Sequence, residues 1–391
     1  MEPDFDEVIN RVGTNSLKFD FARQRGKPED LTPMWVADMD FKAPEEVTKA
    51  LEHKARHGVF GYSEPDERYY QSVKDWFRKR FEWGVESDWI VVAPGLVYAI
   101  YAAVRAFTEA GDAVMIQQPV YYPFASAARD NDRRLIINEL SYDGAAYSID
   151  FDDFERKIVE NDVKLFILCS PHNPVGRVWT RDELIRLGDI CVKRGVIVFS
   201  DEIHADFTYD GHEHLVFADL KPEFAEICVT GTSPSKTFNL AGLQISNIFI
   251  RNKALRLKFK QDIRRSGYGQ ANVMGLVACV AAYEFGESWL FALRRYLTSN
   301  LNFVRAYLGE KAPVIRLVEP EGTYLIWLDC KKMGLNDKRL DEFFVKKARL
   351  WLDEGTMFGA GGGGFTRVNI ACPKSILERA MFQISESLKN L

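Results

Sequence analysis

The chain has 391 residues, which is longer than one ordinary hydrophobic core and predicts two domains. Hydrophobic residues make up 47% and charged residues 27%, the composition of a globular protein, and the net charge of -5 gives no reason to expect nucleic acid or an anionic membrane as a partner. Six cysteines lack the spacing of a disulfide framework or a metal site. No run approaches the roughly 20 apolar residues of a membrane span, and the N-terminus carries no apolar signal segment. We therefore expect a reduced, cytoplasmic protein without a bound metal.

Between about residues 90 and 250, short apolar runs typical of strands alternate with amphipathic stretches typical of helices. The expected strands are 89–93, 113–117, 134–139, 164–169, 196–200, 226–230 and 245–250. Continuous apolar strands separated by helices indicate a mostly parallel sheet that is covered on both faces. The sequence thus predicts an α/β fold with a seven-stranded, mostly parallel sheet.

After about residue 285 the pattern changes to a smaller α+β unit. Strands are expected at 314–317, 323–328 and 367–370, and helices at 337–350 and 374–389. The first 45 residues have few alternations of their own and are expected to fold back onto this unit. We therefore predict a large domain over 46–285 and a small domain made of 1–45 and 286–391.

The segment Gly-Thr-Ser-Pro-Ser-Lys-Thr-Phe-Asn-Leu-Ala-Gly, residues 231–242, follows the expected strand 226–230. A lone lysine in such a place is usually a solvated charge. Here Lys236 is bracketed by Ser233 and Ser235, which favours an amine held in place as an imine with an aldehyde cofactor, while hydroxyl and backbone groups grip an anion beside it.

Other candidate residues also follow strands of the predicted sheet, at the edge where such sheets bind ligands. Gly95, Leu96 and Val97 open a helix whose free amides suit a phosphate, although Pro-Gly before a helix is also an ordinary turn. Asp201 ends the strand 196–200, where a carboxylate can keep a ring nitrogen protonated or simply cap a turn.

Three more residues complete the predicted site. Tyr121 is placed to stack on a planar ring or to pack at a rim, and Asn173 lies in an Asn-Pro turn from which it can donate to a phenolic oxygen. Arg367 follows the glycine run 361–364, as a clamp for a substrate carboxylate or as a surface ion pair. His212 and His214 lack a third ligand and are expected to be solvated.

The order and approximate spacing of these residues resemble the fold-type I pyridoxal-phosphate (PLP) enzymes of the aminotransferase class I/II superfamily, over nearly the whole chain. Four further segments look like the MalY/PatB branch, which consists chiefly of cystathionine β-lyases and related C–S lyases. These segments are Met-Trp-Val-Ala-Asp-Met-Asp-Phe at 34–41, Gly-Tyr-Ser-Glu-Pro at 61–65, Ser-Asp-Glu-Ile-His-Ala-Asp at 200–206 and Ser-Lys-Thr-Phe-Asn-Leu-Ala-Gly at 235–242. One residue departs from the wider superfamily: Gln244 stands where many members carry a phosphate-binding arginine.

The resemblance implies PLP as the cofactor and a role for each matched residue. Lys236 would form the imine and later act as the base at Cα, while Asp201 would hold the ring nitrogen protonated. Arg367 would bind the α-carboxylate of an amino-acid substrate. The remaining implied contacts are ring binding by Tyr121 and Asn173, phosphate binding by Gly95, Leu96, Val97, Ser233 and Ser235, a cofactor contact from His204, and a pocket wall from the backbone of Trp35 to Ala37.

The resemblance also implies a homodimer with shared active sites, in which Tyr62 reaches the phosphate of the neighbouring subunit. Three functions stay open at this point. A lyase would expel a thiolate from Cβ and yield a thiol, pyruvate and ammonia. An aminotransferase would instead release a keto acid, and a regulatory protein would keep the cofactor but act through its surface. The branch-specific segments favour the lyase, and the intact catalytic set argues against regulation as the sole role.

Overall fold

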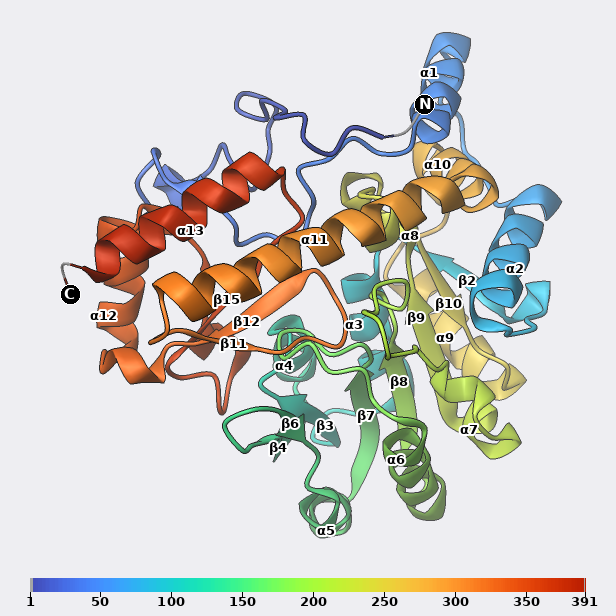
Figure 1. Ribbon diagram of the computed structural model, residues 1–391. Helices are drawn as coiled ribbons and strands as arrows, with labels where there is room; N and C mark the ends of the chain where they lie inside the picture. Colours follow the sequence, from blue (N-terminus) through green and yellow to red (C-terminus); the bar gives the residue numbers. More distant parts are fainter. Residues whose placement is uncertain (1–2, 390) are drawn as a thin grey trace.

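The computed structural model describes residues 3–389 and 391, and it is built around a central seven-stranded sheet (Figure 1). The strand order is β2-β10-β9-β8-β7-β3-β4. These strands are β2 (Ile90–Ala93), β3 (Ala113–Gln118), β4 (Arg134–Glu139), β7 (Val163–Cys169), β8 (Ile197–Asp201), β9 (Cys228–Thr232) and β10 (Ser246–Phe249). Neighbouring strands run parallel except where β10 pairs with β2 and β9. The predicted α/β fold with a mostly parallel sheet is confirmed.

Helices cover both faces of this sheet, which explains why its strands are mostly apolar. One face packs against α3 (Leu96–Phe107), α4 (Pro123–Arg129) and α9 (Lys253–Arg265). The opposite face packs against α5 (Phe151–Asn161), α6 (Arg181–Arg194) and α7 (Pro222–Ile227). A short hairpin of β5 (Ser141–Tyr142) and β6 (Tyr147–Ser148) lies between β4 and α5 in the chain.

A second, antiparallel sheet has the order β11-β12-β15-β14. Its strands are β11 (Arg316–Val318), β12 (Leu325–Asp329), β15 (Phe365–Asn369) and β14 (Asp353–Glu354), and its unit includes α11 (Glu287–Lys311), α12 (Asp337–Glu342) and α13 (Lys374–Leu388). The N-terminal strand β1 (Thr32–Pro33) pairs with β13 (Leu350–Trp351), so the blue N-terminal chain lies beside the orange and red C-terminal part in Figure 1. The domain limits 46–285 and 286–391 stay a prediction.

Several of the expected element boundaries are wrong: β11 and β12 begin two residues later than expected and β15 two residues earlier. Two further differences have a clear physical cause. Residues 226–227 end α7, which starts with a proline at its first position, so the strand begins two residues later than expected. The helix expected over 337–350 ends as α12 at Glu342 and continues as a π-helical turn, Phe343–Lys347. It cannot extend further because Arg349 is left-handed (φ 57°) and the next two residues pair with β1.

Three helices form the side of the molecule away from the C-terminal unit (Figure 1). They are α1 (Glu45–His57), α2 (Glu67–Phe81) and α10 (Val273–Phe285), and α10 packs against both others. At Gly286 the chain bends by 78° into α11. Among the described residues no single helix has both the length and the apolar composition to cross a bilayer, whereas α10 and α11 together meet that test as a bent pair, by length and composition only.

The segment 34–41 is fixed between the two sheets by asparagine side chains. Asn369, in β15, donates its Nδ2 to two carbonyl oxygens of the segment at 2.7 and 2.6 Å. Asn239, which follows α8 (Pro234–Thr237), donates its Nδ2 to two others at 3.0 and 2.8 Å. Because both asparagines bind main-chain groups, they set the path of the backbone itself. The segment therefore forms a wall whose carbonyl groups have defined positions.

Candidate active site

Most of the predicted site residues meet in one cavity of about 270 Å³ at the carboxyl edge of the large sheet. The predicted residues that line it are Ala37, Gly95, Leu96, Val97, Tyr121, Asn173, Asp201, His204, Ser233, Ser235 and Lys236. They come from loops that follow five different strands and from the wall segment 34–41. This placement agrees with the rule that ligands bind beyond the carboxyl ends of such strands.

Lys236 lies in the short helix α8 directly after β9. The helix is fixed by Ser233, whose side chain accepts from the Ser235 amide at 3.1 Å and donates to the carbonyl oxygen of Ile245 at 2.6 Å. Lys236 Nζ donates to the carbonyl oxygen of Ala37 at 2.9 Å. Burial, with the nearby Arg367 charge, lowers the pKa of Lys236 to about 8. A substantial fraction of this amine is therefore neutral near physiological pH.

Asp201 is the last residue of β8 and is 5% exposed. Its Oδ1 accepts from the Ile203 amide at 3.1 Å, and no salt bridge satisfies the carboxylate. Burial raises the pKa of Asp201 to about 7, although that amide and the Lys236 charge act in the opposite direction. A cation placed against this side chain from the cavity would relieve the cost of its burial.

Asn173 and Tyr121 are held together by their backbones, since the Tyr121 amide donates to the carbonyl oxygen of Asn173 at 3.1 Å. Burial raises the pKa of the Tyr121 phenol, so this ring stays neutral. The backbone N–H of Asn173 donates to the sulfur of Cys169 at 3.4 Å. Cys169 itself lines the cavity, a position that its apolar strand gave no reason to expect.

The cavity ends at the first turn of α3. Gly95 precedes this helix with φ 142°, a conformation that other residues rarely adopt. The first amides of α3, at Leu96 and Val97, have no acceptor within the helix and are suited to an anion. Gln244 also lines the cavity, and the lining residues include no arginine. Gln244 therefore lies at the phosphate end of the cavity, where many members of the wider superfamily carry an arginine.

His204 is 3% exposed and lies beside Tyr324, with ring centroids 5.7 Å apart. Burial, with the Lys236 and Arg367 charges, places the pKa of His204 well below its ordinary range, so the imidazole is neutral. Its Nδ1 is buried without a hydrogen-bond partner. The Tyr324 hydroxyl donates to the carbonyl oxygen of Ala37 at 2.9 Å, so it shares an acceptor with Lys236.

Arg367 is 3% exposed and contacts the cavity through Asn173, whose Oδ1 accepts from Nη1 at 3.0 Å. Its Nη2 donates to the carbonyl oxygen of Trp35 at 2.8 Å and forms an ion pair with Asp353. The Trp35 ring is stacked on Trp351 with centroids 4.5 Å apart, so only its backbone takes part in this contact.

One single-residue prediction, for His214, is wrong, and the role of Tyr62 in a neighbouring subunit stays a prediction. Tyr62 is 94% exposed and does not line the cavity of its own chain. Among the described residues no group of three metal-ligating side chains occurs. His214 is buried rather than solvated, because its Nε2 lies 2.8 Å from a carboxylate oxygen of Glu202. The sequence also missed Asp353, which carries no recognisable motif and reaches Arg367 only through strand pairing.

The lowered pKa of Lys236 can be tested by chemical labelling at different pH values. An amine reacts with acylating reagents only when neutral, so in protein freed of any cofactor Lys236 should be labelled with a midpoint near pH 8. Exposed lysines in the same digest, with pKa values of about 10.4, are the internal standard. The change Arg367→Leu should raise the midpoint, since the Arg367 charge lowers this pKa. Labelling of Lys236 along the same curve as the exposed lysines would contradict the assignment.

Comparison with known proteins shows which family the chain belongs to. The sequence model of the family "Aminotransferase class I and II" matches residues 30–384. Cystathionine beta-lyase PatB of Bacillus subtilis is 44% identical over 384 residues, which cover 98% of this chain and 99% of that protein. The crystal structure of cystalysin from Treponema denticola, which contains a pyridoxal 5'-phosphate cofactor, superposes with a TM-score of 0.96 at 38% identity over the full length of both chains. The PLP-bound C-S lyase from Staphylococcus hominis has a TM-score of 0.93 and 33% identity over 99% of this chain and 98% of its own. This protein belongs to the aminotransferase class I and II family.

Proposed function

We propose that this protein is a PLP-dependent C–S lyase, which cleaves cystathionine or related S-substituted L-cysteines to a thiol, pyruvate and ammonia. Two proteins that it resembles over nearly their whole length are named for this activity or for C–S cleavage, PatB of Bacillus subtilis and the C-S lyase of Staphylococcus hominis. The observation that carries the proposal is that an amine with a lowered pKa, Lys236, and a buried carboxylate, Asp201, line the same cavity.

The residues that line the cavity fit PLP. Asp201 is a buried carboxylate without a salt bridge, which suits a protonated ring nitrogen, and Lys236 supplies an amine that is partly neutral. The amides at the start of α3 suit the phosphate. The chemistry that PLP supplies when bound is an electron sink for the pair of electrons left at Cα of an amino acid.

Lys236 has two tasks in the proposed reaction. Its amine would hold the cofactor between reactions, and the same amine, when free, would act as the base at Cα. In the free state the pKa of about 8 leaves enough neutral amine to remove the proton from Cα. The carbonyl oxygen of Ala37, 2.9 Å from Nζ, provides a resting partner for this amine.

The other residues orient the reacting groups. Asp201 would keep the ring nitrogen charged, Asn173 would bind the phenolic oxygen and Tyr121 would cover the ring face, since all three line the cavity. Arg367 binds the α-carboxylate, which places the Cα–H bond toward Lys236. The electron pair released at Cα then forms the Cα–Cβ double bond as the Cβ–S bond breaks and the sulfur leaves as a thiolate. Hydrolysis of the remaining enamine yields pyruvate and ammonia.

Product analysis tests this function. With L-cystathionine as substrate and no 2-oxo acid added, we expect equal amounts of thiol, pyruvate and ammonia, because a thiolate on Cβ is a good leaving group once Cα has lost its proton. Alanine, which lacks a leaving group, should give at most slow half-transamination, so no more than one pyruvate per site under these conditions. The variant Lys236→Ala controls for contaminating lyases. Turnover that requires a 2-oxo acid and releases no thiol would identify an aminotransferase and overturn the proposal.

We further propose that the active unit is a two-fold homodimer. The phosphate end of the cavity has no arginine in its lining, whereas Tyr62 is almost fully exposed on a loop next to Val59 and Phe60, which are 62% and 60% exposed. An exposed aromatic and aliphatic loop indicates an interaction surface. If this loop enters the neighbouring subunit, Tyr62 can complete the phosphate site there.

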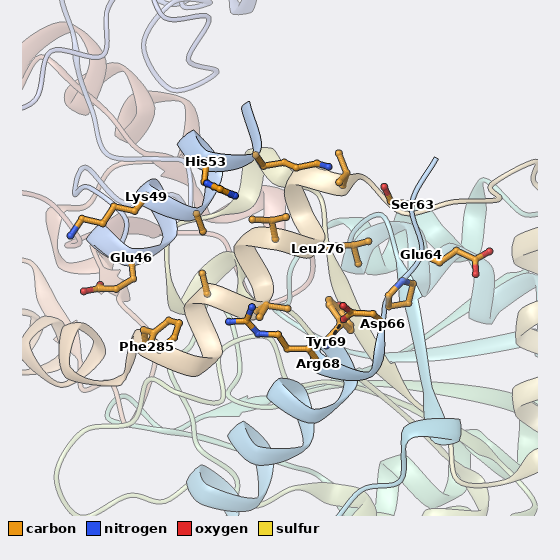
Figure 2. Close-up of a pocket in the computed structure, with 17 residues that line it drawn as sticks. Glu46, Lys49, His53, Ser63, Glu64, Asp66, Arg68, Tyr69, Leu276 and Phe285 are labelled. Carbon is orange, nitrogen blue, oxygen red and sulfur yellow. Dashed lines mark hydrogen bonds between the residues drawn. The ribbon is translucent and has the colours of Figure 1, made fainter. Parts of the chain in front are cut away.

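The surface beside this loop also fits a second copy of the chain. A groove of about 650 Å³ lies between α1, α2 and α10 and continues to Ser63 and Glu64 of the loop. Figure 2 shows the side chains that line it. Its apolar side is supplied by α10, which is apolar around most of its circumference and leaves Phe285 53% exposed. Charged side chains surround this apolar surface, as at the rim of an interface.

Complementation tests the shared site. Tyr62→Ala and Lys236→Ala are each expected to be inactive or slow, but mixed and refolded together they should give about a quarter of the wild-type activity, because about half of the dimers are hybrids with one intact site each. The matched control replaces Lys236→Ala with the double variant Tyr62→Ala/Lys236→Ala, which supplies no intact Tyr62 and should restore nothing. Equal activity in both mixtures, or full activity of Tyr62→Ala alone, would refute the shared site.

The domain division and the cellular location belong to the same proposal. The pairing of β1 with β13 supports a small domain that combines the N-terminal residues with the C-terminal unit. All six cysteines are buried and unpaired, which fits a reducing compartment such as the cytoplasm.

A further inference from the structure

Asp353 lies directly opposite Arg367 on neighbouring strands. The two are register partners in the β14–β15 pair, and both are 3% exposed. The pair is locked in place because the Thr366 hydroxyl donates to the carbonyl oxygen of Asp353 at 3.0 Å. Asp353 Oδ2 and Arg367 Nη2 form an ion pair. A buried carboxylate is thus built against the one arginine that is proposed to bind substrate.

The contacts of Arg367 leave a defined set of free donors. A guanidinium has five N–H groups. One N–H of Nη1 donates to Asn173, and Nη2 donates to Trp35 and Asp353. The ring of Phe358 lies 4.9 Å from the guanidinium carbon and fixes the plane of the group. What remains is Nε, which is buried without a partner, and the second N–H of Nη1.

Fold stability gives little reason for a carboxylate at this position. Burial raises the pKa of Asp353, and the Arg367 charge opposes this shift, so the ion pair offsets a desolvation cost. Buried ion pairs are often replaced by apolar residues without loss of stability. The geometry instead makes sense for orientation, because Asp353 binds Nη2 and so restricts how the guanidinium can rotate.

We propose that Asp353 is a positioning residue, which acts through Arg367 to hold its guanidinium in the orientation from which a remaining N–H donor reaches the α-carboxylate of the substrate. The proposal rests on the proposed function in assigning the α-carboxylate to Arg367. Asp353 also neutralises much of the Arg367 charge. The substrate carboxylate is therefore recognised more by the orientation of the Arg367 hydrogen-bond donors than by electrostatic attraction to a net positive charge. A substitution of Asp353 should therefore change kcat, which depends on how the bound carboxylate is oriented, differently from KM, which depends on how strongly the carboxylate is attracted.

Three variants separate these effects. Asp353→Ala removes both the acceptor and the charge, so kcat should fall about 10- to 100-fold, as for the loss of other supporting contacts and small misplacements. Its KM should not rise, since the Arg367 charge is no longer compensated. Asp353→Asn keeps an acceptor for Nη2, so it should restore most of kcat and lower KM. Glu354→Gln, at the next position of the same short strand, is the matched control and should leave both constants unchanged.

Binding of L-alanine, followed by the absorbance of the bound cofactor, gives a readout that needs no turnover. We expect Asp353→Asn to bind L-alanine more tightly than the wild type and Glu354→Gln to bind it equally. Should every S-substituted cysteine fail to release thiol while this binding pattern holds, the proposed function fails and the role of Asp353 stands.

The proposal is overturned if kcat of Asp353→Ala matches that of Glu354→Gln, or if Asp353→Asn is as slow as Asp353→Ala. Loss of affinity at unchanged kcat would also overturn it, because that pattern marks a direct binding group. If Asp353→Ala does not fold, the affinity of Asp353→Asn for L-alanine becomes the test. An affinity equal to that of the wild type would contradict the proposed neutralisation of Arg367.

Discussion

The carbonyl groups of the wall segment 34–41 are the constraint on which the site depends. The carbonyl of Ala37 accepts from Lys236, and that of Trp35 accepts from Arg367. Lys236 lies in α8, directly after a strand of the large sheet, and Arg367 lies in the small sheet, so a segment from near the N-terminus sets the separation of the two functional groups. Any shift of its backbone would move the acceptor of the proposed base and that of the proposed carboxylate clamp together.

Ion pairs also hold this wall segment in place. Asp40 accepts from Lys18 at 2.8 Å and from Arg11 at 2.7 Å, and Arg11 also contacts Asp38 at 2.6 Å. Lys18 is 1% exposed, so these charges are held in a low-dielectric setting where loss of one partner is costly. The N-terminal residues, which carry no catalytic motif, thereby support the geometry of the site.

The sequence predicted the fold and most of the cavity because both follow from local signals. Apolar runs marked all seven strands of the large sheet, and Gly95, Asp201 and Lys236 were found because each comes directly after one of them. Boundaries failed where long-range pairing overrides local preference, as at 337–350, where pairing with β1 ends the helix. Asp353 and Tyr324 escaped prediction for the same reason: their contacts join residues that are far apart in the chain and leave no local pattern.

The central claim of this account is that Lys236 is the covalent attachment point of the cofactor, and chemical trapping tests it most directly. Protein loaded with PLP is reduced with borohydride, digested and mapped by mass spectrometry. The account predicts one stable phosphopyridoxyl adduct, on the peptide that carries Lys236, and its disappearance together with the visible absorbance in Lys236→Ala. A reducible adduct on another lysine, or one that persists in Lys236→Ala, would contradict it.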